Sequence, residues 1–189
     1  MAAPRNVDLR GRATLSEDGL YRYTLHRILP SPVRWVRTVL FVMLNPSTAD
    51  ATIVDPTLAT CLQFARVWGC TDLALGNLFA YRSTDWKACQ RVADPVGPDN
   101  DAHLVALARS AVIIVCAWGS HAKEIHPLRA RAVVKLLREA TDVPLYALAL
   151  NKDGAPRHPL YVPTTTDAVL FGETLGAVYP PETPRILCP

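Results

Sequence analysis

Four short, almost uninterrupted apolar runs constrain the fold of this chain more than any other feature of its sequence. They are Thr38–Leu44 (TVLFVML), Asp72–Phe79 (DLALGNLF), Ala111–Trp118 (AVIIVCAW) and Leu145–Leu150 (LYALAL). Continuous apolar runs are typical of parallel strands that are covered on both faces, whereas half-exposed strands alternate apolar and polar residues. We therefore expect the four runs to form a mainly parallel sheet.

Helical patterns separate the apolar runs. They lie at Pro56–Trp68, Asn100–Ala108 and Pro127–Ala140. The last of these mixes apolar positions with Arg and Lys at helical spacing, which is typical of an amphipathic helix. Alternating strands and helices predict an α/β fold, here a three-layer α/β/α sandwich around a four-stranded, mainly parallel sheet. Residues 19–28 alternate roughly and predict an edge strand or hairpin.

The length of 189 residues suits one domain. We expect a single domain over residues 1–189, with a core at about residues 36–175, an N-terminal edge segment and a proline-rich C-terminal tail. Half of the residues are apolar and 20% are charged, which excludes a disordered, collagen-like or coiled-coil protein. The formal net charge of +3 neither requires nor excludes a polyanionic partner.

Membrane and metal-binding classes are disfavoured by the sequence. The longest apolar stretch, residues 111–118, is far below the ~20 residues of a spanning helix, and the N-terminus lacks an apolar signal core. Five cysteines without a CxxC pair argue against a disulfide framework, a zinc site and an iron–sulfur cluster. We expect a cytoplasmic monomer that needs no metal or cofactor and does not bind membranes.

Polar residues follow each of the predicted strands. Asn45 comes after the first, Asn77 lies near the end of the second, Ser120 and His121 follow the third, and His158 follows the fourth. Ligands of parallel sheets bind beyond the carboxyl ends of the strands. These side chains therefore predict a cleft for a small, flat, hydrogen-bonding ligand, in which an Asn amide could orient a water or read a donor–acceptor edge.

The order of these motifs resembles the uracil-DNA glycosylase superfamily. The motifs are Leu44-Asn45-Pro46, Asn77 within its apolar run, Trp118-Gly119-Ser120-His121-Ala122 and His158-Pro159, within a match that spans residues 38–162. The whole pattern, with Asn-Pro-Ser-Thr-Ala-Asp and Arg-His-Pro-Leu-Tyr, also looks like a bacterial and phage family, domain-of-unknown-function family 1643.

The resemblance to the glycosylases implies hydrolysis of the bond between a base and deoxyribose in DNA, after the nucleotide has been flipped into a pocket. It implies that Asn45 holds the attacking water, that His158 stabilises the departing base and that Asn77 reads the base edge. Further roles are implied beside the base (Pro46, Ser47 and Thr48) and in contact with DNA (Arg82, Ser120, Lys123, Arg157, Leu160 and Tyr161).

Two positions depart from the resembling enzymes. Asn45 stands where the uracil enzymes use Asp, and an amide activates water less strongly than a carboxylate. Ser47 stands where they place a Tyr that excludes a 5-methyl group, so there is room beside carbon 5 of the base. We therefore expect a monofunctional DNA glycosylase that acts on a uracil-like or C5-modified pyrimidine.

Two other functions fit the same residues. One is a nucleosidase or nucleotide hydrolase that acts on free nucleotides, and the other is a non-catalytic protein that binds DNA or a modified base. Structural interpretations also stay open: Asn45-Pro46 as a turn, Asn77 as a buried structural amide, His158 as a surface-loop residue and the cations as a solvated rim.

Overall fold

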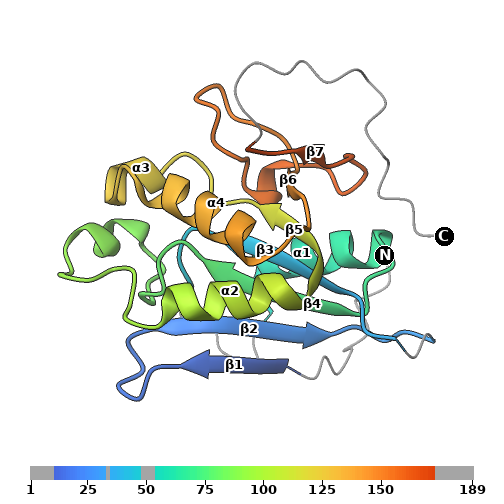
Figure 1. Ribbon diagram of the computed structural model, residues 1–189, viewed down its shortest axis with the longest axis horizontal. Coiled ribbons are helices and arrows are strands. Elements are labelled where there is room, and N and C mark those ends of the chain that lie inside the picture. Colours follow the sequence, from blue (N-terminus) through green and yellow to red (C-terminus); the bar gives the residue numbers. More distant parts are fainter. Residues whose placement is uncertain (1–10, 33–34, 48–53, 173–189) are drawn as a thin grey trace.

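The computed structural model describes residues 11–32, 35–47 and 54–172 (Figure 1). In these ranges the strands are β1 (Gly11–Leu15), β2 (Arg22–Ile28), β3 (Thr38–Met43), β4 (Asp72–Asn77), β5 (Ala111–Cys116), β6 (Leu145–Ala147) and β7 (Val169–Leu170). The α-helices are α1 (Pro56–Val67), α2 (Asn100–Ser110), α3 (Ala122–Ile125) and α4 (Arg129–Ala140), and the 3-10 helices are η1 (Trp86–Gln90) and η2 (Pro159–Tyr161).

Within the described ranges the strands form one mixed sheet of seven, in the order β1-β2-β4-β3-β5-β6-β7. The four predicted runs form β4, β3, β5 and β6, and neighbours in this central group are parallel. The α/β class is therefore confirmed, but a four-stranded sheet is too small. Antiparallel β2 pairs with β4 and antiparallel β7 with β6, so both edges of the parallel group are hydrogen-bonded.

Local sequence explains where the central elements begin and end. Every residue of β3 is buried, which agrees with its uninterrupted apolar run. Asp55 caps α1, because its Oδ1 accepts a hydrogen bond from the backbone N–H of Leu58 at 2.7 Å, and Pro56 occupies the first turn. The helix ends before Gly69, whose φ of +62° lies in the left-handed region that favours glycine.

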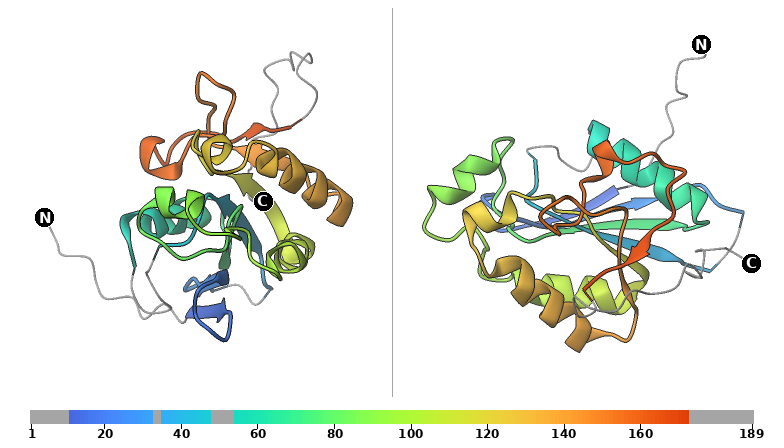
Figure 2. Two further views of the ribbon diagram at one scale, coloured as in Figure 1. Left: turned by 90° about the vertical axis from the view of Figure 1, so that its left-hand side faces the viewer. Right: turned by 90° about the horizontal axis from the view of Figure 1, so that it is seen from above.

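Helices cover both faces of the sheet (Figure 2). On one face, Leu62 and Phe64 of α1 belong to the same buried cluster as Phe41 and Val115. On the other face, a second buried cluster joins α2 and α4 to the sheet, with Leu104, Leu107, Val133, Leu137, Leu40 and Ile114 among its members. In the described ranges, no helix has the length and apolar character needed to cross a membrane.

Candidate functional site

A cavity of about 680 Å³ lies where β3, β4 and β5 end. Asn45, Asn77 and Ser120, which stand at or just beyond these three strand ends, line it. Its other walls are the start of α1 and the segment that includes His158. This volume is in the range of ordinary small-molecule sites, and the position agrees with the general rule for ligands of parallel sheets.

The side chain of Asn45 is held in one orientation. Its Nδ2 donates to the carbonyl oxygen of Ser83 at 2.8 Å and to that of Pro46 at 3.3 Å. Two carbonyl partners identify this end of the amide as the nitrogen. Within the described ranges the Oδ1 accepts no hydrogen bond, so Asn45 offers an acceptor at the cavity wall. Such an oxygen is suited to orient a water molecule.

We expect Asn45→Asp to lower the stability of the protein. The substitution replaces the Nδ2 donor by an oxygen that faces the carbonyl of Ser83, so a 2.8 Å hydrogen bond becomes a repulsive contact. Loss of a hydrogen bond at this partly buried position costs about 1 kcal/mol. Chemical denaturation of the two proteins would measure the difference. An unchanged free energy of unfolding would mean that the Ser83 contact does not anchor Asn45.

Asn77, the last residue of β4, presents its amide to the cavity. The residue is 3% exposed, and its side chain makes no hydrogen bond to any residue of the described ranges. A buried amide without a protein partner is costly unless something else satisfies it. The donor and the acceptor of Asn77 are therefore available to a ligand or to water.

Two buried polar residues hold the backbone beside Asn77. The Nδ2 of Asn100 donates to the carbonyl oxygens of Asn77 and Leu78 at 3.0 and 3.2 Å, and the Nε of Arg129 donates to Leu78 at 2.8 Å. On the other side, the N–H of Leu78 donates to the carbonyl of Met43. The strand ends that carry Asn45 and Asn77 are thus fixed relative to one another.

His158 stands at the start of η2, against the loop that follows β5. Gly119 adopts a φ of +72°, and its N–H donates to the carbonyl of Pro156 at 2.9 Å, which ties the two segments together. The His158 Nδ1 accepts a hydrogen bond from the N–H of Leu160 at 3.3 Å, so the proton of the neutral ring is at Nε2. Burial lowers the pKa of His158, although the nearby Asp55 carboxylate opposes this.

We expect the stability of the protein to fall as the pH drops below about 6.5, the ordinary pKa of histidine, and His158 to contribute to this loss. Its folded-state pKa is lowered, so between pH 6.5 and that lower pKa the unfolded chain binds more protons than the folded chain. His158→Asn removes the titrating ring, and the free energy of unfolding should then fall less steeply between neutral pH and about pH 5. Equal slopes for both proteins would contradict a buried neutral His158.

The side of the cavity at the start of α1 carries charged residues. Ser47 Oγ donates to Asp55 Oδ2 at 3.1 Å, and the carbonyl oxygen of Ser47 accepts from a guanidinium nitrogen of Arg22 at 3.5 Å. Arg22 is 5% exposed. Burial lowers its pKa to about 10, repulsion from Arg82 acts in the same direction, and Asp55 opposes the shift, so Arg22 is a cation at neutral pH. We call Arg22, Ser47 and Asp55 the charged wall.

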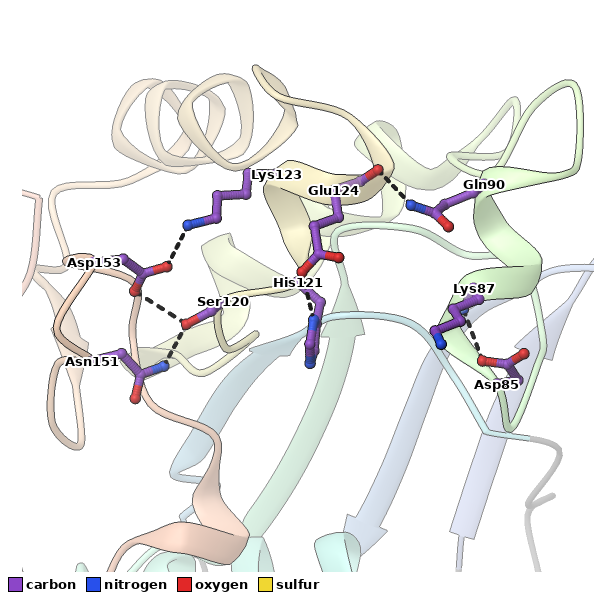
Figure 3. A network of polar contacts seen from close by, with 9 residues as sticks. All are labelled: Asp85, Lys87, Gln90, Ser120, His121, Lys123, Glu124, Asn151 and Asp153. Carbon is purple, nitrogen blue, oxygen red and sulfur yellow. Dashed lines mark hydrogen bonds and ion pairs between the residues drawn. The ribbon is translucent and has the colours of Figure 1, made fainter.

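A polar network borders the cavity at Ser120 (Figure 3). Ser120 Oγ donates to Asp153 and accepts from Asn151, and Lys123 forms a 2.9 Å ion pair with Asp153. The Lys123 hydrogen bond is the main reason why the pKa of Asp153 is lowered to about 2. His121 bonds Glu124 through Nδ1 and stacks on Trp86, a further cavity residue, with ring centroids 4.3 Å apart.

The remaining predicted residues are divided between the cavity and its surroundings. Exposed Leu160 and Tyr161 line the cavity. Four others are absent from its described lining: Pro46, Arg82, Lys123 and Arg157. Pro46 is buried, Arg82 donates to the carbonyl of Gly19, and Arg157 donates to Asn151. Thr48 lies outside the described residues.

The family model described as "Protein of unknown function (DUF1643)" matches residues 22–160, which is most of the chain. The protein belongs to the DUF1643 family. The resemblance to this family is thereby confirmed, whereas the relationship to the uracil-DNA glycosylases stays a prediction. No curated protein and no solved structure matches the chain.

The matched region of the DUF1643 protein begins at a cavity residue that sequence reasoning did not select, Arg22. Trp86 was also missed, and Asp55, which directly precedes the predicted helix at Pro56–Trp68, was not among the selected site residues. None of the three belongs to a motif that follows a predicted parallel strand. The buried position of Arg22 becomes visible only once β2 is seen to lie between β1 and β4.

The cavity of the DUF1643 protein combines an acceptor at Asn45, a donor and an acceptor at Asn77 and a neutral N–H donor at His158. This set matches a flat ligand that carries carbonyl and N–H groups. In the described ranges, no group of three or more His, Cys, Asp and Glu side chains is placed to hold a metal ion.

Proposed function

We propose that the protein is a DNA glycosylase that hydrolyses the N-glycosidic bond of a uracil-like or C5-modified pyrimidine. The observation that carries the proposal is the unpartnered, nearly buried amide of Asn77 in the same cavity as Asn45 and His158. A uracil-like edge has adjacent carbonyl and N–H groups, and one amide can pair with both. A structural Asn would instead be expected to bond to the protein.

The proposed reaction divides the work among the three side chains. Asn45 Oδ1 orients a water whose oxygen bonds to the sugar carbon, while the bond between that carbon and the base nitrogen breaks and its electron pair moves onto the base. His158 Nε2–H donates a hydrogen bond to a base carbonyl on which negative charge develops. Asn77 holds the base in position. The attacking water loses one proton, which passes through solvent to the departing base anion, so the products are a neutral free base and an abasic sugar.

The test is a screen of the purified protein against oligonucleotides that carry uracil, thymine mismatches, hypoxanthine and C5-modified pyrimidines. Alkali cleaves an abasic product and reveals it. We expect strand cleavage for at least one pyrimidine with the wild type, and loss of cleavage when both Asn45 and His158 are replaced by Ala. Base binding without an abasic product from any oligonucleotide would overturn glycosylase activity and favour a non-catalytic binder.

One observation favours a second candidate, a hydrolase of free nucleotides. Among the predicted DNA contacts, Lys123 is paired with Asp153 and Arg157 is bonded to Asn151, and neither belongs to the described lining of the cavity. A protein that contacts several DNA phosphates loses affinity steeply as salt rises. We expect DNA affinity to fall with salt. Activity on mononucleotides that is insensitive to salt would favour the second candidate.

A further inference from the structure

The charged wall is a part of the cavity that has no role in the proposed reaction. Asp55 accepts through Oδ1 from the backbone of α1 and through Oδ2 from Ser47 at 3.1 Å. Arg22, almost fully buried, donates to the backbone of Ser47. A carboxylate, a hydroxyl and a guanidinium therefore line one side of a cavity whose other polar groups are neutral at Asn45, Asn77 and His158.

The chemistry of this wall limits what can lie against it. A phosphate would be attracted by Arg22 but repelled by the Asp55 carboxylate, and an apolar group would leave the remaining acceptor positions of the Asp55 carboxylate without a partner. A neutral hydroxyl avoids both penalties. It can donate to Asp55, because an ionised carboxylate accepts about four hydrogen bonds and only two are made here, and the Ser47 hydroxyl, which donates to the same carboxylate, helps to hold that acceptor in place.

The shape of a pyrimidine decides which of its atoms would face this wall. If Asn77 pairs with the N–H and the carbonyl of one edge, and His158 with the carbonyl next to the glycosidic bond, the remaining edge carries carbons 5 and 6. We propose that the charged wall binds a hydroxyl-bearing group on carbon 5, so that the substrate is a hydroxymethyl pyrimidine or a larger hydroxylated derivative. This inference rests on the proposed function and deepens it.

A pair of isosteric substrates tests the inference. Deoxyuridines with a 5-hydroxymethyl or a 5-ethyl group differ only in the exchange of a hydroxyl for a methyl. We expect the wild type to bind the hydroxymethyl nucleoside at least about tenfold more tightly, the effect of one hydrogen bond to a charged partner. Calorimetry with the free nucleosides measures this ratio without any turnover, and matched oligonucleotides measure it as rates of abasic-site formation.

Asp55→Asn is the informative variant. An Asn is a good N-cap, so its oxygen can keep the bond to Leu58, while an NH₂ group replaces the Oδ2 acceptor. We expect the hydroxymethyl-to-ethyl ratio to fall to near one in Asp55→Asn. Ser47→Ala should reduce the ratio without touching the helix cap. Lys135→Ala, an exposed position on α4 whose described ion pair is to Glu139, should leave the ratio unchanged.

The outcomes separate this inference from the proposed function. Two results would overturn the proposed hydroxyl-binding site even if uracil is released. One is equal affinity of the wild type for the hydroxymethyl and ethyl nucleosides, and the other is a wild-type affinity ratio in both Asp55→Asn and Ser47→Ala. A ratio that Asp55→Asn abolishes, together with no abasic product from any base, would support the subsite and overturn the glycosylase. Release of hydroxymethyluracil at least about tenfold faster than of 5-ethyluracil, lost in Asp55→Asn, would support both.

Discussion

Replacement of Asn77 by leucine is expected to abolish base binding while leaving the fold at least as stable as in the wild type. Asn77 is 3% exposed as a residue and its side chain makes no hydrogen bond within the described ranges, so the substitution removes no protein hydrogen bond of the side chain. The amide lines the cavity and is available to water, so leucine leaves no protein donor or acceptor unpaired. Binding that depends on the amide should fall by about a hundredfold or more.

Asn100→Leu is the matched control. Asn100 is buried like Asn77, but its Nδ2 donates to the carbonyls of Asn77 and Leu78, so its removal takes a donor from each of them and leaves Leu78 with the Arg129 Nε alone. We expect Asn100→Leu to lower the free energy of unfolding by about 2 kcal/mol or more. Denaturant titration and calorimetry with a uracil nucleoside measure both effects. Destabilisation of Asn77→Leu to the same extent as Asn100→Leu would mean that Asn77 is a structural residue.

The central strands were predictable because strands that are buried on both faces have almost uninterrupted apolar sequences. β3, β4 and β5 match the predicted runs to within two residues at each end. The size of the sheet was not predictable in this way. β7 has only two residues, Val169 and Leu170, too few to show any periodicity, and its pairing is defined by the backbone of β6 rather than by its own side chains.

The residues of the candidate site were likewise predictable only in part. Asn45, Asn77 and His158 could be selected because they follow strands whose ends must meet at one edge of the sheet. The hydrogen-bond and ion-pair partners of the predicted DNA-contacting cations could not be predicted in this way. Lys123 and Asp153 are 30 residues apart and meet only because the loops after β5 and β6 lie together. Sequence reasoning could therefore not predict that Lys123 forms an ion pair with a carboxylate of the same chain.

Replacement of His158 by asparagine is expected to slow base release by about a hundredfold or more without unfolding η2. An Asn oxygen can take the place of Nδ1 and accept from the N–H of Leu160, and Asn is a favourable residue at a helix start. The side chain is too short to present a donor at the position of Nε2. Removal of one donor that stabilises developing negative charge typically costs a factor of about 10² to 10³ in rate.

The complementary variant is His158→Gln, because the amide nitrogen of Gln reaches the position of Nε2 but its side chain offers no acceptor at the position of Nδ1. We expect His158→Gln to release the base within about tenfold of the wild-type rate and to lose about 1 kcal/mol of stability with the cap. Single-turnover rates and denaturant titrations on both variants separate the two nitrogens. If His158→Asn is as fast as the wild type, Nε2 is not the group that stabilises the departing base. If both variants are equally slow, the ring itself is required, and its lowered pKa, caused by burial, reflects packing against the cavity rather than a donor role.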